Sequence, residues 1–209
     1  SACFILEKKI KVYFLGPRGT FSEIAAAKHF GSSVEKLETE NIQNIFKEVF
    51  KNKNSYGVLP FENSIEGMVN QSLDSLIESD LKICSELELS IEHCLFSSEK
   101  SMKKLSIIYG HPQAFAQCRN WLNRNLPKVK FIEVESSAKA AQLIKNKSGR
   151  GCIGPENISE IYSLNLLKDK IQDQKTNTTR FLIIGNEFPS KTSDDKTSIS
   201  LSLKNEQGA

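Results

Sequence analysis

The sequence predicts an α/β protein in which parallel or mixed sheets are covered by helices. Short apolar runs alternate with segments of helical periodicity along most of the 209 residues. Residues 81–96 instead alternate apolar and polar side chains with a period of two, as a long strand or a strand pair does. The chain is long enough for one large core or for two small lobes, and the alternating segment is placed to cross between two lobes.

The apolar runs and periodic segments define an ordered series of strands and helices. Thr20 and Glu23 have the spacing of a capping box, which predicts the start of the first helix. The predicted strands and their following helices are 12–15 with 21–30, 34–37 with 42–50, 56–60 with 65–77, 106–109 with 113–126, 129–134 with 137–145 and 151–154 with 156–164, and a strand at 181–184 closes the series. Residues 187–198 are polar and turn-rich, which predicts a linker before a further strand that starts at 199.

The composition is that of a globular protein, with 39% hydrophobic and 25% charged residues. A net charge of +3, without a basic stripe, does not indicate nucleic-acid binding. No apolar run is long enough to span a membrane. The five cysteines are odd in number and form no CxxC pair, so we expect reduced core residues in a cytoplasmic protein.

Three clusters of polar side chains lie at the ends of predicted strands or beside them. They are Glu62-Asn63-Ser64, His111-Pro112-Gln113 with Gln117, and Asn177-Thr178-Thr179-Arg180-Phe181. Ligands of α/β folds bind beyond the carboxyl ends of strands. Because the clusters contain mainly neutral donors and acceptors, they predict a pocket for a small polar anion. The three histidines lack the spacing of metal ligands, so no metal site is predicted.

The segment 16–20, between the first strand and the first helix, has two interpretations. Backbone N–H groups at the helix start, with the hydroxyls of Thr20 and Ser22, can hold a carboxylate or phosphate. The alternative is an ordinary tight turn. The segment is not GxGxxG and no Walker lysine follows it, so a nucleotide is not indicated.

Each of the three clusters also has a purely structural interpretation. Asn63 and Ser64 belong to types that commonly cap helices, and His111 fits a position at the start of a helix. Threonines are common in strands, and Arg180 can form a surface ion pair. The residue types alone leave these alternatives open.

Taken together, the motifs resemble the prephenate dehydratase family, in particular the dehydratase segment of bifunctional chorismate mutase–prephenate dehydratases. The resemblance covers about residues 10–186. It rests on five ordered motifs, which are FLGPRGTFSEIAA (14–26), GVLPFENSIEGMVNQSLDSL (57–76), IYGHPQAFAQC (108–118), SSAKAA (136–141) and IQDQKTNTTRFLIIG (171–185).

The resemblance implies two α/β lobes like those of a type II periplasmic binding protein, with the active site in the interlobe cleft. The crossover would lie near 81–97 and the return near 170–181. The implied reaction converts prephenate to phenylpyruvate, carbon dioxide and water in phenylalanine biosynthesis. Because the ring becomes aromatic, the reaction is steeply downhill, and no metal, nucleotide or redox cofactor is required.

The resemblance also implies roles for individual residues. Thr179 would lie at the leaving hydroxyl, and Asn63 and Gln117 would orient the ring. The residues implied in substrate binding are Thr20, Ser22, Glu62, Ser64, His111, Gln113, Thr178, Arg180 and Phe181.

The ends of the chain resemble parts of neighbouring domains. Residues 1–9 are similar to the end of a chorismate mutase helix and its linker, and 187–209 to a linker and the first strand of an ACT domain. The sequence thus looks like the middle of a longer protein that is also a chorismate mutase. Phenylalanine would bind only through the missing ACT domain and should not inhibit this chain. Family members often dimerise, so a homodimer is an expectation too.

Two departures and two alternatives accompany the resemblance. The segment GPENISEIY (154–162) stands where members usually carry small residues. Gly110 stands where members usually carry serine, so a hydroxyl that helps to hold the substrate is missing and weaker binding is expected. An arogenate dehydratase of the same fold is one alternative. A non-catalytic module that binds a small anion is the other.

Overall fold

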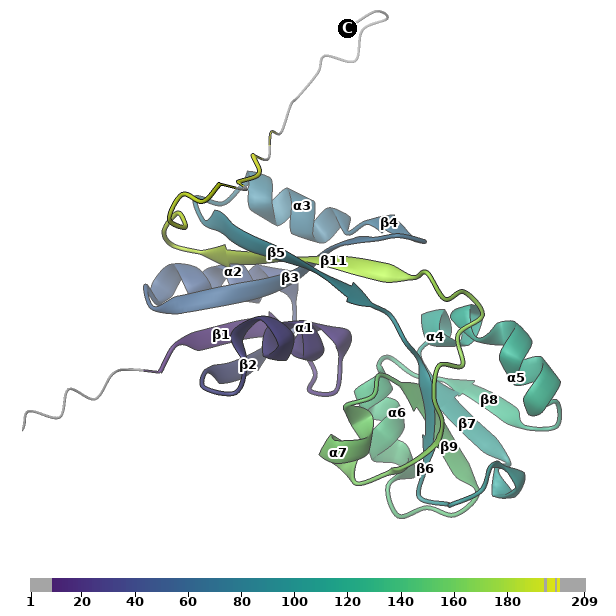
Figure 1. The fold of residues 1–209 in the computed structure, drawn as a ribbon. Coiled ribbons are helices and arrows are strands. Elements are labelled where there is room, and N and C mark those ends of the chain that lie inside the picture. The colour runs from purple at the N-terminus through teal and green to yellow at the C-terminus, as the bar shows by residue number, and fades with distance from the viewer. Residues whose placement is uncertain (1–8, 194, 198, 200–209) are drawn as a thin grey trace, which may run out of the picture.

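The computed structural model describes residues 9–193, 195–197 and 199, which fold into two α/β lobes (Figure 1). Lobe 1 consists of β1 (Lys11–Leu15), α1 (Phe21–Phe30), β2 (Glu35–Thr39), α2 (Ile42–Lys51), β3 (Ser55–Asn63), β4 (Gly67–Met68), α3 (Asn70–Ile77), β5 (Lys82–Ser90) and β11 (Thr178–Gly185). Lobe 2 consists of β6 (Cys94–Ser97), a short 3₁₀ helix (Met102–Lys104), β7 (Ile107–Gly110), α4 (Pro112–Gln117), α5 (Arg119–Asn125), β8 (Lys130–Glu133), α6 (Ser137–Ile144), β9 (Arg150–Gly154), α7 (Ile158–Tyr162) and β10 (Asn165–Lys168).

Lobe 1 is a six-stranded sheet between helices. The strand order is β2-β1-β3-β11-β5, with β4 beside β3, and β11 runs antiparallel to both of its neighbours. Successive strand residues point to opposite faces. Phe14 therefore packs on one face with α1, and Tyr13 on the other with α2.

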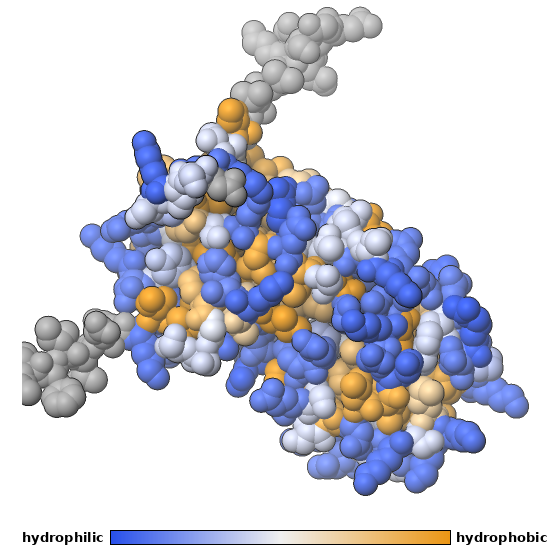
Figure 2. Space-filling view, viewed as in Figure 1, coloured by the Kyte–Doolittle hydropathy of each residue, from blue (hydrophilic) through white to orange (hydrophobic). Residues whose placement is uncertain are grey.

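Lobe 2 repeats this layering around a five-stranded sheet with the order β10-β6-β9-β7-β8. Leu95 packs with α4 and α5 on one face, and its neighbour Phe96 packs with α6 and α7 on the other. The predicted fold class, two α/β lobes, is confirmed. Apolar residues reach the surface only in patches among polar ones on the face shown in Figure 2.

Two crossing segments, residues 91–93 and 169–177, connect the lobes (Figure 1). They bond to each other: Ile91 N–H donates to the Asn177 carbonyl, and Ile171 N–H donates to the His93 carbonyl, both at 2.8 Å. The chain therefore passes between the sheets as a paired strip and not as two independent linkers.

The structure corrects several local predictions. Thr20 precedes α1 but makes no side-chain capping bond, so the capping box is not formed. Residues 65–69 are not helical, because β3 extends to Asn63 and turns back into β4 with Gly67 at a φ of 83°. The predicted helix 113–126 is two helices, α4 and α5.

The last two strands also differ from prediction. β10 is not predicted from the sequence, and β11 starts at Thr178, three residues before the predicted 181. No helix of the described residues is long and apolar enough to cross a membrane. Residues 1–8 of the predicted mutase remnant, and the predicted strand beyond 199, lie outside the described residues.

Gly57 allows β3 to lie close to α2 and β11. A Cβ atom there would lie 2.5 Å from Ile45 Cγ2 and 2.9 Å from Ile184 Cγ1. Because such overpacking typically costs about 1–3 kcal/mol, we expect Gly57→Ala to lower the free energy of unfolding by that amount in urea titrations. Gly151→Ala, whose Cβ would find its nearest atoms at 3.2 Å, should cost less. Equal losses in the two variants would contradict this packing argument.

Candidate functional site

The pairing of β3 with β11 joins two of the predicted polar clusters. Because β11 is antiparallel to β3, its first residues lie at the carboxyl end of β3, and Thr179 stands opposite Asn63. Opposed residues of neighbouring strands share a face of the sheet. The Asn63 amide donates to the Thr179 hydroxyl oxygen over 2.9 Å. Two residues 116 positions apart thus form one cluster.

Backbone donors determine the orientation of the Asn63 amide. Its Oδ1 accepts from the N–H of Ile65 at 2.9 Å and from that of Glu66 at 3.1 Å. Its Nδ2 therefore faces Thr179 Oγ1 and Asn177 Oδ1, the latter at 2.8 Å. Thr179 accepts in this pair, and no acceptor for its own O–H lies among the described residues. A buried hydroxyl is left able to donate to a ligand.

Asn177 connects this cluster to Gln117 of lobe 2. Asn177 is 2% exposed, and its Nδ2 donates to Gln117 Oε1 at 3.1 Å. Gln117 Nε2 donates in turn to Glu66 Oε1 at 3.2 Å. We call Asn63, Asn177, Gln117 and Thr179 the amide network. It contains all three residues predicted to be catalytic, together with Asn177.

Three residues of the network or beside it, Asn177, Glu66 and His93, were given no individual role by the sequence. Asn177 stands directly before the Thr-Thr-Arg run, so its position was a usable signal. Glu66 and His93 carried no such signal, because tertiary contacts alone bring them to the network. His93 Nε2 lies 2.8 Å from Gln117 Oε1, and its ring meets Phe21 of α1 edge-on with centroids 5.5 Å apart.

His93 lies in the first crossing segment and is 5% exposed. Burial lowers the pKa of His93 from its ordinary value of 6.5. The hydrogen bond to Gln117 opposes this shift, and the charge of His111 adds to it. The imidazole is therefore neutral at neutral pH.

Ser64 and Thr178 anchor the ends of β3 and β11 to each other. Ser64 N–H donates to the Thr178 carbonyl at 2.9 Å, and Thr178 N–H donates to Ser64 Oγ at 3.0 Å. The Ser64 hydroxyl also donates to the carbonyl of Thr176 at 3.4 Å. The Ser64 hydroxyl is thus engaged in hydrogen bonds with the backbone of residues 176 and 178. Its predicted contact with substrate stays a prediction.

Arg180 and Glu62 lie on the sheet face opposite to Thr179. Arg180 Nη2 meets Glu62 Oε2 at 2.7 Å, and its guanidinium lies 5.3 Å from the centre of the Phe61 ring. Phe181 is 1% exposed within the core beneath α1. This placement favours a structural role for all three, which hold β11 in register against β3.

The segment 16–20 already binds carboxylates that belong to the protein itself. Arg18 N–H donates to Glu38 and Gly19 N–H donates to Glu23, each at 2.7 Å. Thr20 Oγ1 donates to the Leu15 carbonyl at 3.2 Å. Ser22, by contrast, is 6% exposed, and its hydroxyl has no hydrogen-bond partner among the described residues.

His111 and Gln113 form the start of α4. His111 Nδ1 accepts from the Gln113 N–H at 3.3 Å, so the side chain caps the helix. The Gln113 amide donates to Glu66, the same carboxylate that Gln117 reaches. Residues four apart share a helix face, and here they bring α4 against lobe 1.

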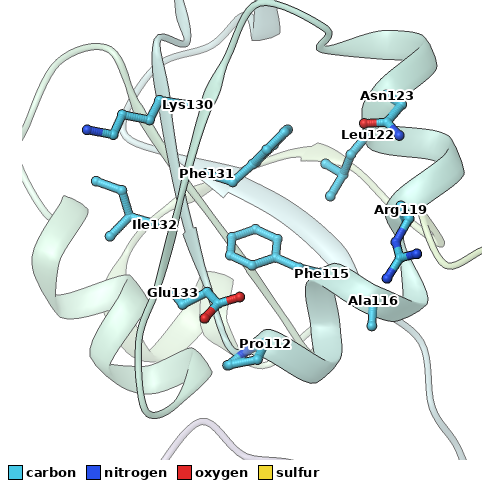
Figure 3. Close-up of a pocket in the computed structure, with 10 residues that line it drawn as sticks. All are labelled: Pro112, Phe115, Ala116, Arg119, Leu122, Asn123, Lys130, Phe131, Ile132 and Glu133. Atoms are coloured by element: carbon cyan, nitrogen blue, oxygen red, sulfur yellow. The ribbon is translucent and has the colours of Figure 1, made fainter.

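Two hollows lie near these residues. One, of about 530 Å³, opens between the lobes, and its lining includes Glu66, Gln117 and Asn177 but neither Asn63 nor Thr179. The other, of about 690 Å³, lies within lobe 2 between α4–α5 and β8 (Figure 3). Of the predicted site residues, none lines this second hollow, whose floor is the ring pair Phe115–Phe131.

The Phe115 ring lies close to Gly110. A Cβ at position 110 would lie 3.0 Å from Phe115 Cζ and 3.1 Å from Cε1. The ring occupies the space that a serine side chain would need. A side chain at position 110 would therefore require the Phe115 ring to shift.

Comparison with known proteins places the chain in a family. A family model described as prephenate dehydratase matches residues 12–189. The chain belongs to the prephenate dehydratase family. It is 44% identical over 210 residues to the bifunctional chorismate mutase/prephenate dehydratase of Stutzerimonas stutzeri, covering 100% of this chain and 58% of that protein. The chain thus spans less than two thirds of that relative's length.

Two further relatives show how far the similarity extends. The prephenate dehydratase of Methanocaldococcus jannaschii is 38% identical over 208 residues, which cover 95% of this chain and 74% of that protein. The crystal structure of prephenate dehydratase in complex with L-Phe from Arthrobacter aurescens superposes with a TM-score of 0.78 at 27% identity. The match covers 88% of this chain and 63% of that one.

The Gly110–Phe115 pair makes a stability prediction. Gly110→Ser should lower the free energy of unfolding by about 1–3 kcal/mol, because the new side chain overpacks the ring. Phe115→Leu removes the ring, so the double variant should lose less than the sum of the two single losses in urea titrations. Strictly additive losses would show that Phe115 does not occupy the space of residue 110.

Proposed function

We propose that this chain catalyses the decarboxylative dehydration of prephenate to phenylpyruvate. Family membership supports the reaction. The observation that carries the mechanism is the Thr179 hydroxyl, which accepts from Asn63 and keeps its own O–H available.

The reaction breaks two bonds of the ring substituents. The bond from the ring to the carboxylate breaks, and its electron pair enters the ring while carbon dioxide leaves. The bond from the ring to the hydroxyl breaks on the opposite side, and the hydroxyl takes up one proton and leaves as water. The substrate dianion and one proton thus become phenylpyruvate, carbon dioxide and water.

Thr179 assists the step that limits this chemistry, the departure of hydroxide. A threonine is too weak an acid to protonate the leaving group outright, so it donates a hydrogen bond while solvent supplies the proton. Loss of one hydrogen-bond donor that stabilises charge developing in the transition state typically costs about 10²–10³-fold in kcat. Asn63 and Gln117 orient the substrate, and the free hydroxyl of Ser22 at the start of α1 helps to hold a carboxylate.

We also propose that the whole protein acts in phenylalanine biosynthesis and carries a chorismate mutase, as the names of the bifunctional relatives suggest. Residues 187–209 would lead into a domain that binds phenylalanine. We also propose a cytoplasmic location, where Cys84, Cys94, Cys118 and Cys152 would stay reduced.

Substitution of Thr179 tests the mechanism. We expect Thr179→Ala to lower kcat at least about 100-fold with little change in KM, because the donated bond matters chiefly in the transition state. Thr179→Ser keeps the hydroxyl and should retain most of the activity. The measurement is phenylpyruvate absorbance after prephenate is mixed with the purified chain.

Thr176→Ala is the matched control, since Thr176 is an exposed threonine of the second crossing segment. It should leave kcat unchanged. Wild-type turnover in Thr179→Ala would remove Thr179 from the mechanism. No phenylpyruvate from the wild-type chain, with prephenate still bound, would instead show a binding module.

A further inference from the structure

His93 is a buried side chain that the proposed mechanism does not use. Its Nδ1 has no hydrogen-bond partner among the described residues, and its Nε2 lies 2.8 Å from Gln117 Oε1. A neutral imidazole has one donor and one acceptor nitrogen. The partners of Gln117 decide which nitrogen carries the proton.

The direction of every hydrogen bond in the amide network follows from groups that have only one role. The N–H groups of Ile65 and Glu66 can only donate, so Asn63 must present its oxygen to them and its Nδ2 to Asn177. Asn177 Oδ1 then accepts, and Asn177 Nδ2 donates to Gln117 Oε1.

Glu66, at the other end of the network, fixes the same orientation of the Gln117 amide. The Glu66 carboxylate only accepts, so Gln117 presents its Nε2 to Glu66 and its Oε1 to Asn177 and His93. A carbonyl oxygen accepts two hydrogen bonds. The proton of neutral His93 is therefore on Nε2.

We propose that His93 is a positioning residue for the dehydration, whose Nε2–H, together with Asn177, fixes the amide of Gln117 that orients the substrate. This inference rests on the proposed function. Without the imidazole donor, Gln117 Oε1 keeps Asn177 as its one partner, and the side chain can turn away from the network. His93 thus acts through other groups and touches no reacting atom.

The first test reads the tautomer and does not depend on activity. The chain has three histidines, so nitrogen-15 NMR of the imidazoles can be assigned with His29→Gln and His111→Gln. We expect His93 to be the Nε2–H form at neutral pH, and His93→Leu to shift the side-chain amide signals of Gln117 and Asn177. A proton on Nδ1 alone would overturn the proposal.

The second test is kinetic. We expect His93→Leu to lower kcat about 10-fold with KM changed less than about threefold, as for the loss of one orienting hydrogen bond. His93→Gln, which returns an N–H donor near the place of Nε2, should recover most of this loss. In a Gln117→Ala background, which lacks the amide that His93 holds, His93→Leu should lower kcat no further.

Controls separate this role from a purely structural one. His29→Gln, at an exposed position of α1, should leave kcat unchanged. Equal losses of kcat in His93→Leu and His93→Gln, in proportion to lowered melting temperatures, would overturn the proposal. A wild-type chain that makes no phenylpyruvate would defeat the proposed function and the kinetic role together, and the tautomer would then decide the hydrogen-bond assignment alone.

Discussion

The antiparallel pairing of β11 with β3 is the constraint on which the site depends. It sets Thr179 opposite Asn63 and Arg180 opposite Glu62. Because alternate residues of a strand face opposite sides, this register sends the hydroxyl and the amide to one face and the ion pair to the other. A shift of this register by one residue would place side chains of β11 on the opposite face of the sheet, so that the hydroxyl and the amide would no longer share a face. The anchoring bonds between Ser64 and Thr178 are therefore part of what makes the site, although neither side chain needs to meet a substrate.

The crossing segments contribute two buried polar side chains to the site. They carry His93 and Asn177 between two sheets, and both side chains are buried there. Buried polar groups are costly unless they are paired. The network satisfies nearly all of them by linking Asn63 of lobe 1 to Gln117 of lobe 2. The same bonds that make the burial tolerable also fix which atom of each amide faces which neighbour.

The sequence predicts the fold better than the site. Strand and helix periodicity give the order of most elements, because buried faces require regular apolar spacing. The predictions are wrong at Gly67, whose φ of 83° belongs to the turn between β3 and β4, and at β10, which pairs with β6 and is absent from the predicted series. Three motifs point to Asn63, Gln117 and Thr179, because those residues stand at strand ends or at a helix terminus. Glu66 and His93 could not be found this way, since nothing in their local sequence distinguishes them from ordinary surface and core residues.

Glu66 gives the arrangement a further property. One carboxylate at the edge of lobe 1 receives two glutamine side chains from α4 of lobe 2, and the adjacent backbone N–H of the same residue holds Asn63. Separation of the lobes at this point would release Gln113 and Gln117 together while leaving Asn63 in place. A single carboxylate therefore ties both glutamines of α4 to lobe 1, and replacing it would remove two contacts between the lobes at once.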